Sequence, residues 1–182
     1  MELNFATSNE HKYKEAKMIL KKEGIGVNWI PFSHTEIRSE SFEEIAVDAV
    51  KAAYRKIKKP VFVEDGGLVV ESLNGFPCTF SAWVQRKIGS AGVLKLMDGV
   101  ENRTARFMLA IAWTDGEKVK TFTAYSEGTI TNEKKGVSGF GYDSIFIPNG
   151  YEKTFAESPE IKEKISHRKK ALMKLITFIK KL

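Results

Sequence analysis

The spacing of apolar residues switches repeatedly between two patterns along this chain. Uninterrupted apolar runs are typical of buried strands, whereas apolar residues three or four positions apart are typical of amphipathic helices. Extended and apolar stretches predict strands at Leu3–Ala6, Val27–Ile30, Val61–Val63, Leu68–Val70, Arg106–Thr114, Lys118–Ile130 and Ser144–Ile147. Helical spacing predicts helices after the polar turn Thr7–Asn9, after Ser41, over Ile88–Met97 and from Ile161 to Ile179. Strands mixed with helices in this way predict an α/β domain with a mixed sheet.

Turn and cap residues define the ends of several of these elements. Ser41–Glu44 has the serine and glutamate spacing of a helix capping box, in which Glu44 is the reciprocal member. Glu64–Gly67 stops the strand that begins at Val61, and Asp115–Gly116 predicts the tight turn of a hairpin. No internal repeat, low-complexity tract or linker interrupts the chain, so its 182 residues predict a single domain.

The composition is that of a soluble globular protein. Apolar residues make up 42% and charged residues 29%, and no apolar run reaches the roughly 20 residues that span a bilayer. The amino terminus lacks the basic and apolar regions of a signal peptide. Cys78 is the only cysteine, so no disulfide can form within the chain. These features predict a cytoplasmic protein with no membrane partner.

The formal net charge of +6 is concentrated near the carboxyl terminus. Residues 160–182 contain eight Lys or Arg and two Glu, and the remainder of the chain contains 21 residues of each sign. Because this segment also has helical apolar spacing, its lysines from Lys169 to Lys181 are interpreted as the solvated face of a helix. We therefore predict no nucleic acid partner. A nucleic-acid-binding module is the alternative, and it requires salt-sensitive binding to oligonucleotides.

Thr7–Lys12 follows the first predicted strand and is the first candidate for ligand binding. Backbone N–H groups, small hydroxyls and Lys12 at the start of a helix can hold phosphate oxygens. A capped helix with an exposed lysine explains the same residues equally well.

Glu64–Gly67 is the second candidate, because its acids follow a buried strand where open α/β sheets bind ligands. An acidic turn is the alternative. Side chains alternate along a strand, so Glu64 and Asp65 face opposite ways and one of them serves structure. A carboxylate beside phosphates needs a divalent cation between them, which predicts Mg2+. Four more acids can each supply a metal oxygen, and their spacing does not choose among them: Glu36, Glu43, Glu44 and Asp48.

Gly139–Asp143 forms the third candidate together with His167 and Arg168. Flanking glycines free the backbone, Phe140 can stack on a base, and Asp143 can accept hydrogen bonds from ring N–H groups. His167 and Arg168 can both donate to a 6-keto oxygen, and such a donor pair rejects a 6-amino group. This chemistry favours inosine-like and xanthosine-like bases over adenine.

Six segments, in order and spacing, resemble the inosine triphosphate pyrophosphatase family, also called the Ham1 or non-canonical purine NTP pyrophosphatase family. They are Phe5–Lys12, Glu64–Leu68, Leu73–Pro77, Gly139–Asp143, Thr154–Glu157 and Ile165–Arg168. The resemblance implies an elongated α/β fold, with a curved mixed β-sheet flanked by helices and two lobes around a central nucleotide cleft within residues 1–182. It also implies a homodimer that uses Mg2+ to hydrolyse ITP, dITP and XTP to the nucleoside monophosphate and pyrophosphate, which cleanses the nucleotide pool.

The resemblance also implies a role for individual residues. Asp65 matches the acid that binds metal and helps to activate water, and Glu36 matches the other metal ligand. The implied substrate contacts are Thr7, Ser8, Asn9, Glu10, His11, Lys12, Gly66, Phe140, Gly141, Tyr142, Asp143, Lys162, His167 and Arg168. Among them, Lys12 and Lys162 are expected to offset charge on the phosphates.

Two positions depart from the family pattern. Gly66 stands where serine or threonine is common, so backbone or water would replace a hydroxyl contact. Cys78 stands where glycine is usual, which puts the geometry of its loop in question. A pyrophosphatase for modified pyrimidine nucleotides is the nearer alternative function, but it gives His167 and Arg168 no 6-keto group to bind.

Overall fold

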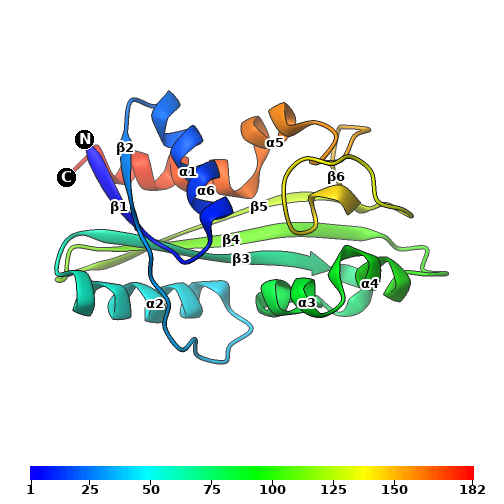
Figure 1. Cartoon of the computed structure of the whole chain (residues 1–182), viewed down its shortest axis with the longest axis horizontal. Helices are drawn as coiled ribbons and strands as arrows, with labels where there is room; N and C mark the ends of the chain where they lie inside the picture. Colours follow the sequence, from blue (N-terminus) through cyan, green and yellow to red (C-terminus); the bar gives the residue numbers. More distant parts are fainter. The chain divides into compact units, whose positions relative to one another are not determined.

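Six strands form one sheet in the computed structural model, which describes residues 1–182, and their order is β2-β1-β3-β4-β5-β6 (Figure 1). The strands are β1 (Glu2–Ala6), β2 (Gly26–Ile30), β3 (Val61–Val70), β4 (Thr104–Thr114), β5 (Val119–Ile130) and β6 (Phe146–Pro148). β1 runs parallel to β2 and β3, whereas β6 runs antiparallel to β5. The predicted mixed sheet is therefore confirmed.

Six α-helices flank the strands, and three short 3-10 helices lie in the connections. The α-helices are α1 (Glu10–Lys22), α2 (Phe42–Ile57), α3 (Ser81–Lys87), α4 (Gly89–Leu96), α5 (Pro159–Ile165) and α6 (His167–Ile179). The 3-10 helices are Glu71–Leu73, Cys78–Phe80 and Asp143–Ile145. No helix combines the length and the apolar character that crossing a bilayer requires.

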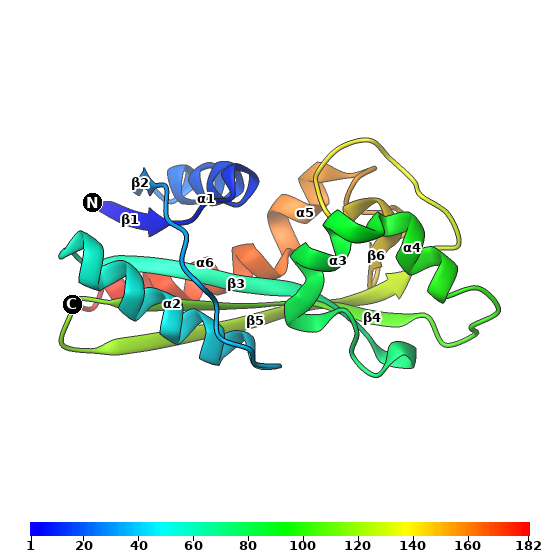
Figure 2. The same cartoon turned by 60° about the horizontal axis from the view of Figure 1, so that its bottom comes forward.

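The chain divides into two compact units, each with its own buried apolar cluster. The first unit comprises Met1–Asp65, Leu109–Ala124 and Arg168–Leu182. Within it, α1 and α6 lie on one side of the strands and α2 lies on the other (Figures 1 and 2). Phe5 and Phe62 stack in its core with their ring centroids 4.4 Å apart.

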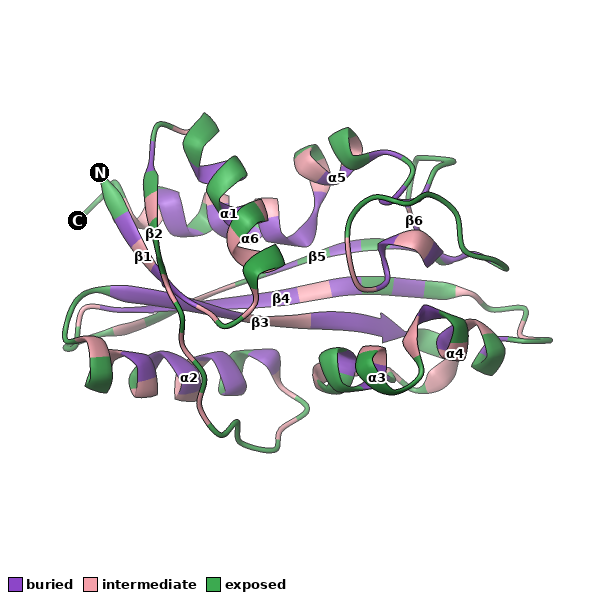
Figure 3. Ribbon diagram, in the orientation of Figure 1, coloured by how far each residue is buried: buried purple, intermediate pink, exposed green.

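The second unit comprises Gly66–Met108 and Tyr125–His167. Three phenylalanines pack together in its core, since Phe146 lies 4.7 Å from Phe107 and 5.3 Å from Phe155 between ring centroids. Figure 3 shows the buried residues along the strands and on one face of several helices. The two lobes around a nucleotide cleft, as implied by the resemblance, stay a prediction.

β3 is one continuous strand through Glu64–Gly67, so the predicted interruption there is wrong. A Cβ atom on Gly67 would lie 2.2 Å from the Ser81 hydroxyl and 2.5 Å from the Cys78 carbonyl oxygen. Without that atom, the Ser81 hydroxyl comes close enough to accept a hydrogen bond from the Leu68 N–H at 2.9 Å. This glycine therefore permits a close approach between segments and does not form a turn.

Connected hydrogen bonds among Ser39, Ser41 and Glu44 cap the amino terminus of α2. Ser41 accepts from the Glu44 N–H at 3.2 Å, as the capping pattern predicts. The reciprocal bond is different, because the Ser39 hydroxyl donates to the Glu44 carboxylate at 2.6 Å and accepts from the Ser41 N–H at 3.0 Å. Ser39 therefore stands between the two residues that a capping box joins directly.

The helical segment predicted from Ile161 to Ile179 forms two helices, because Ser166 between them has extended backbone angles. Leu172 and Leu175 are buried in the first unit, as the spacing predicts. Four lysines of α6 and its end are exposed: Lys170, Lys174, Lys180 and Lys181. The interpretation as a solvated face holds for these four lysines, whereas Lys169 is half-buried and pairs with Glu23 at 2.8 Å.

Candidate functional site

The turn Thr7–Lys12 joins β1 to α1 in the first unit and combines a helix cap with exposed polar groups. The Asn9 side-chain oxygen accepts from the N–H groups of His11 at 3.0 Å and Lys12 at 3.3 Å, so Asn9 is the N-cap. The Thr7 hydroxyl accepts from the Asn9 N–H at 3.1 Å. Ser8, Glu10 and His11 are exposed at the positive end of the helix, where anions are favoured.

Lys12 extends from this turn to β3. Its ammonium lies 3.4 Å from the main-chain oxygen of Glu64 and 3.9 Å from the Glu64 carboxylate. Asp65, the next residue on β3, is half-buried, and its Oδ2 atom is buried. The first unit therefore brings a phosphate-seeking cation to the strand position beside a predicted catalytic carboxylate.

Glu64 and Asp65 have different environments, as expected for neighbours on a strand. Glu64 is 9% exposed and receives three hydrogen bonds from the Arg168 guanidinium, at distances of 2.7 to 3.1 Å. The sequence left the role of Glu64 open. In the structure, Glu64 is the acid that is committed to an internal ion pair.

Arg168 is 3% exposed and contacts two carboxylates in the first unit. Its NH1 group donates to Glu15 on α1, and its other bonds go to Glu64 on β3. Burial alone would lower the pKa of Arg168, but the neighbouring carboxylates raise it above its ordinary value. The guanidinium therefore stays charged, and both acids fix its orientation.

The structure distinguishes the four acids that the sequence left equivalent. Glu43 accepts from the Thr121 hydroxyl, Glu44 accepts from Ser39, and Asp48 lies 3.7 Å from His34 Nε2. Glu36 is exposed and makes no hydrogen bond or ion pair. It is the one member of this set whose carboxylate is not engaged within the chain.

Phe140, Asp143 and Lys162 meet in the second unit. The Lys162 ammonium lies 2.6 Å from Asp143 Oδ2 and 4.6 Å from the centroid of the Phe140 ring. The same carboxylate oxygen accepts from the Phe140 N–H at 2.8 Å. Gly139 has a φ of +77°, and a Cβ atom there would lie 2.3 Å from Asp143 Oδ2. Glycine is therefore required for this carboxylate to approach the loop.

The other predicted contacts of the second unit differ in exposure. His167 is 6% exposed and stacks on Phe107 with ring centroids 4.9 Å apart. Tyr142 is buried in the core, where its hydroxyl donates to the Ser81 carbonyl at 2.9 Å and burial raises its pKa. Gly66 is half-buried on β3, and the Gly141 carbonyl accepts from the Ser90 hydroxyl at 3.0 Å. Tyr142 thus has a clear packing role.

Cys78 has a φ of +50°, in the left-handed region that favours glycine. The loop keeps the backbone conformation of a glycine although a larger residue occupies the position. The Cys78 carbonyl accepts from the Ser81 hydroxyl at 2.7 Å, which anchors this conformation.

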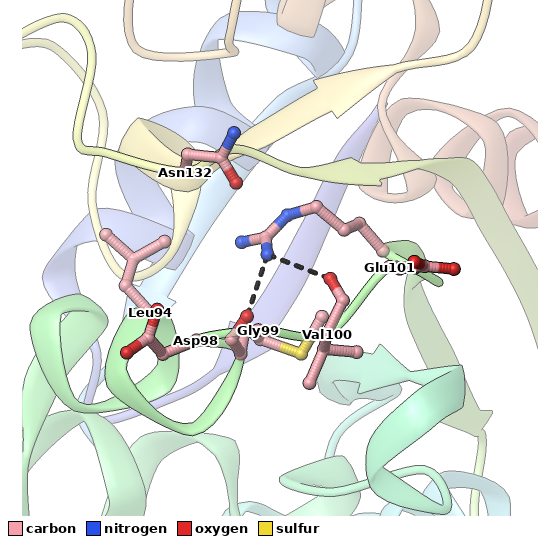
Figure 4. A pocket seen from close by; sticks show the side chains of 8 residues that line it. Leu94, Asp98, Gly99, Val100, Glu101 and Asn132 are labelled. Atoms are coloured by element: carbon pink, nitrogen blue, oxygen red, sulfur yellow. Dashed lines mark hydrogen bonds between the residues drawn. The ribbon is translucent and has the colours of Figure 1, made fainter.

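A separate hollow of about 390 Å³ lies in the second unit, and no predicted site residue lines it (Figure 4). Its wall includes Arg103, whose guanidinium donates to the carbonyl oxygens of Met97, Val100, Ile130 and Thr131 at 2.6 to 3.4 Å. This arginine holds together backbone segments of the unit.

Two residues of the site were not singled out from the sequence. Glu15 binds Arg168, and Ser39 bonds to Glu44 near Glu36. Glu15 follows Lys12 by one helical turn, so both lie on one face of α1, and that spacing was an available signal. No spacing signal links Ser39 to Glu44, because Ser39 lies outside the helix.

Comparison with known proteins gives consistent results over the whole chain. The model of the Ham1 family matches residues 3–178. A dITP/XTP pyrophosphatase of Methanopyrus kandleri is 46% identical over 182 residues, covering 99% of this chain and 97% of that protein. A second protein of that name, from Thermococcus kodakarensis, is 42% identical and covers 99% and 98%.

Solved structures show the same fold. A HAM1 protein from Coxiella burnetii superposes with a TM-score of 0.84 at 28% identity, covering 100% of both chains. The Ham1 protein of Staphylococcus aureus superposes with a TM-score of 0.82 at 30% identity, covering 97% of this chain and 98% of that one.

Proposed function

This chain belongs to the Ham1 family, and from that premise we propose that it hydrolyses ITP, dITP and XTP to the nucleoside monophosphate and pyrophosphate. Relatives named dITP/XTP pyrophosphatase, at 42–46% identity, support this substrate class. The observation that carries the chemistry is the contact of Lys12 with Glu64. It brings a cation suited to phosphate to the strand position next to Asp65.

Mg2+ is the cofactor of this proposal, and Glu36 and Asp65 are the residues that would hold it. The structure contains no group of three or more His, Cys, Asp or Glu side chains suited to a metal ion. Mg2+ commonly binds through one or two carboxylates together with substrate phosphates, so two carboxylate side chains fit this mode. The bound ion supplies positive charge that offsets the phosphate oxygens.

In the proposed reaction, a water molecule cleaves the phosphoanhydride bond between the α and β phosphates. Asp65 accepts the proton of that water, and pyrophosphate leaves. Lys12 donates to the phosphates and offsets the charge that develops on them. The turn between β1 and α1 contributes N–H groups at the positive end of the helix.

Phe140, Asp143, His167 and Arg168 serve base recognition in the proposal. Phe140 provides an aromatic face for stacking, and Asp143 accepts from ring N–H groups. His167 and Arg168 donate to the 6-keto oxygen. The position of Lys162 against Asp143 and Phe140 supports a contact at the base in addition to the expected contact with phosphate.

We also propose that the protein acts as a homodimer in the cytoplasm. The family resemblance supports the dimer, and the composition, with its single cysteine, supports the location. Light scattering coupled to gel filtration measures the assembly, and a mass near 20.5 kDa would contradict the dimer.

The decisive experiment is a panel of nucleoside triphosphates assayed for pyrophosphate and for orthophosphate, with and without Mg2+. The proposal requires pyrophosphate from ITP, dITP and XTP, little product from ATP, and none without the metal. Modified pyrimidine triphosphates belong in the panel, because faster turnover of these would support the alternative function.

Asp65→Asn tests the residue assignment in the same assay. We expect kcat on ITP to fall about 10²–10⁴-fold, the range for loss of a positioned base. Asp98→Asn is a matched control, because Asp98 is exposed and belongs to the separate hollow. Near-normal turnover by Asp65→Asn would remove Asp65 from the reaction.

A further inference from the structure

Residues 31–41 join β2 to α2 and carry Glu36 without regular secondary structure. Phe32, His34 and Ser39 are half-buried, whereas residues 35–38 between the last two are all exposed (Figure 3). The segment is thus attached on either side of Glu36 and projects between the attachments. Its geometry decides where the Glu36 carboxylate lies.

Ser39 makes the stronger attachment. Its hydroxyl donates to the Glu44 carboxylate at 2.6 Å and accepts from the Ser41 N–H at 3.0 Å. A hydroxyl bonded to an ionised carboxylate is a charge-assisted contact and is stronger than a neutral one. It attaches the segment to the first turn of α2, three residues after Glu36.

His34 makes the weaker attachment, two residues before Glu36. Its Nε2 atom lies 3.7 Å from Asp48 Oδ2 on α2, which is longer than a hydrogen bond. The His34 ring also stacks on Phe32 with ring centroids 5.4 Å apart. Ser39 and His34 therefore both contact residues of α2, and His34 also packs on Phe32 within its own segment.

We propose that Ser39 is a positioning residue for metal binding, because it holds the Glu36 segment on the amino terminus of α2, with His34 as a second attachment. This inference rests on the proposed function, in which Glu36 is a ligand of Mg2+. A segment that is free to move presents Glu36 only part of the time, and the apparent affinity falls by that fraction.

Ser39→Ala tests the attachment and Thr121→Val is its matched control. The Thr121 hydroxyl donates to Glu43, the neighbour of Glu44 on α2, but Thr121 lies on β5 and does not hold the segment. Both variants therefore remove one hydroxyl bonded to one α2 glutamate. Ser39→Thr retains the hydroxyl and should restore normal behaviour.

The first measurement is the dependence of ITP hydrolysis on Mg2+. If the competent fraction falls to about one tenth, the Mg2+ concentration for half-maximal rate rises about tenfold in Ser39→Ala. We expect kcat at saturating Mg2+ to change less than about twofold, because the metal then selects the competent conformation. Asp48→Ala should shift the Mg2+ requirement in the same direction by less.

The second measurement needs neither metal nor substrate. Trypsin cleaves after Arg38, which lies between the attachments, and cleavage of a transiently released segment follows its population. Mass spectrometry should show about tenfold faster cleavage at Arg38 in Ser39→Ala, and an unchanged rate in Thr121→Val and Ser39→Thr.

The two measurements separate the possible failures. Unchanged cleavage at Arg38 in Ser39→Ala would overturn the attachment. Faster cleavage with an unchanged Mg2+ requirement would overturn the role in metal binding. If the unaltered protein released no pyrophosphate from ITP, the proposed function would fail by itself, and the cleavage rates would still decide whether Ser39 holds the segment.

Discussion

Each unit of the molecule contains a cluster in which one buried cation contacts carboxylate groups, and the two clusters are built differently. In the first unit, Arg168 reaches both Glu64 and Glu15. In the second unit, Lys162 meets the carboxylate of Asp143 at 2.6 Å. Both cations are nearly inaccessible, at 3% and 6% exposure. The shape of the cation therefore distinguishes the clusters, whereas burial does not.

The difference indicates different roles. A guanidinium is a rigid planar fork, and bonds to two carboxylates fix both its position and its direction. An ammonium is a point charge on a flexible stem and can exchange one acceptor for another. We therefore expect that Arg168 contributes mainly to stability and, to a lesser extent, to base selectivity. Loss of Lys162 should weaken ligand binding and lower the stability less than loss of Arg168 does.

Arg168→Ala should lower the stability of the protein more than any other change considered. Removing this side chain leaves two buried carboxylates without their cation, so the free energy of unfolding should fall by about 3–5 kcal/mol. Urea denaturation at neutral pH measures it. Lys170→Ala, an exposed change on the same helix, is the control and should be nearly neutral. A loss below about 1 kcal/mol in Arg168→Ala would contradict the structural role.

Lys162→Met should cost less, about 1–3 kcal/mol, because Asp143 keeps its hydrogen bond from the Phe140 N–H. The KM for ITP should rise at least about tenfold, equivalent to 1.4 kcal/mol. Lys164→Met on the exposed side of α5 is the matched control. Equal losses of stability in Lys162→Met and Arg168→Ala would remove the distinction between the clusters.

Arg168→Lys tests selectivity while retaining a positive charge. A lysine cannot bond to two carboxylates in a fixed direction, so the ratio of kcat/KM for ITP over ATP should narrow by about tenfold, or 1.4 kcal/mol. Steady-state kinetics on both nucleotides measures the ratio. An unchanged ratio in the folded variant would exclude Arg168 from base recognition.

The smallest effect is expected at the surface pair of Lys169 and Glu23, 2.8 Å apart. The hydrogen bond and charge of Lys169 lower the pKa of Glu23. Because the folded-state pKa is depressed, the stabilisation is present above the ordinary glutamate value of about 4.3 and is lost as pH falls through the lower one. Lys169→Met should thus be slightly less stable at pH 7 and equal in strong acid, by denaturation at low salt. A difference that persists in acid would assign the effect to packing.

Most elements of the fold could be predicted from apolar spacing, but α3 was not. Ser81 and Val84 are buried while Trp83 is 54% exposed, so the short helix lacks a clear apolar stripe. The interruption predicted in β3 was wrong for a related reason. Gly67 indicates a turn by its local sequence, yet its function is to admit Ser81 from a segment that is distant along the chain.

The candidate site, like the fold, could be predicted only in part from the sequence. The residue types and their order indicate which side chains carry chemistry, but not which contacts they make. Of four acids near α2, only their neighbours in space show that Glu36 is the one left unengaged. Tyr142 belongs to a predicted binding motif, yet its contact with Ser81 shows a packing role that the motif does not contain.

The sequence already shows that Glu64 and Asp65 face opposite ways, because side chains alternate along any strand. Which of the two is buried depends on tertiary packing. That choice depends on α1 and α6, which bring Glu15 and Arg168 to one face of β3. A buried carboxylate needs a cation at hydrogen-bonding distance, and the chain supplies this one from 104 residues away. Local sequence fixes the direction of a side chain, whereas packing between distant segments fixes what it meets.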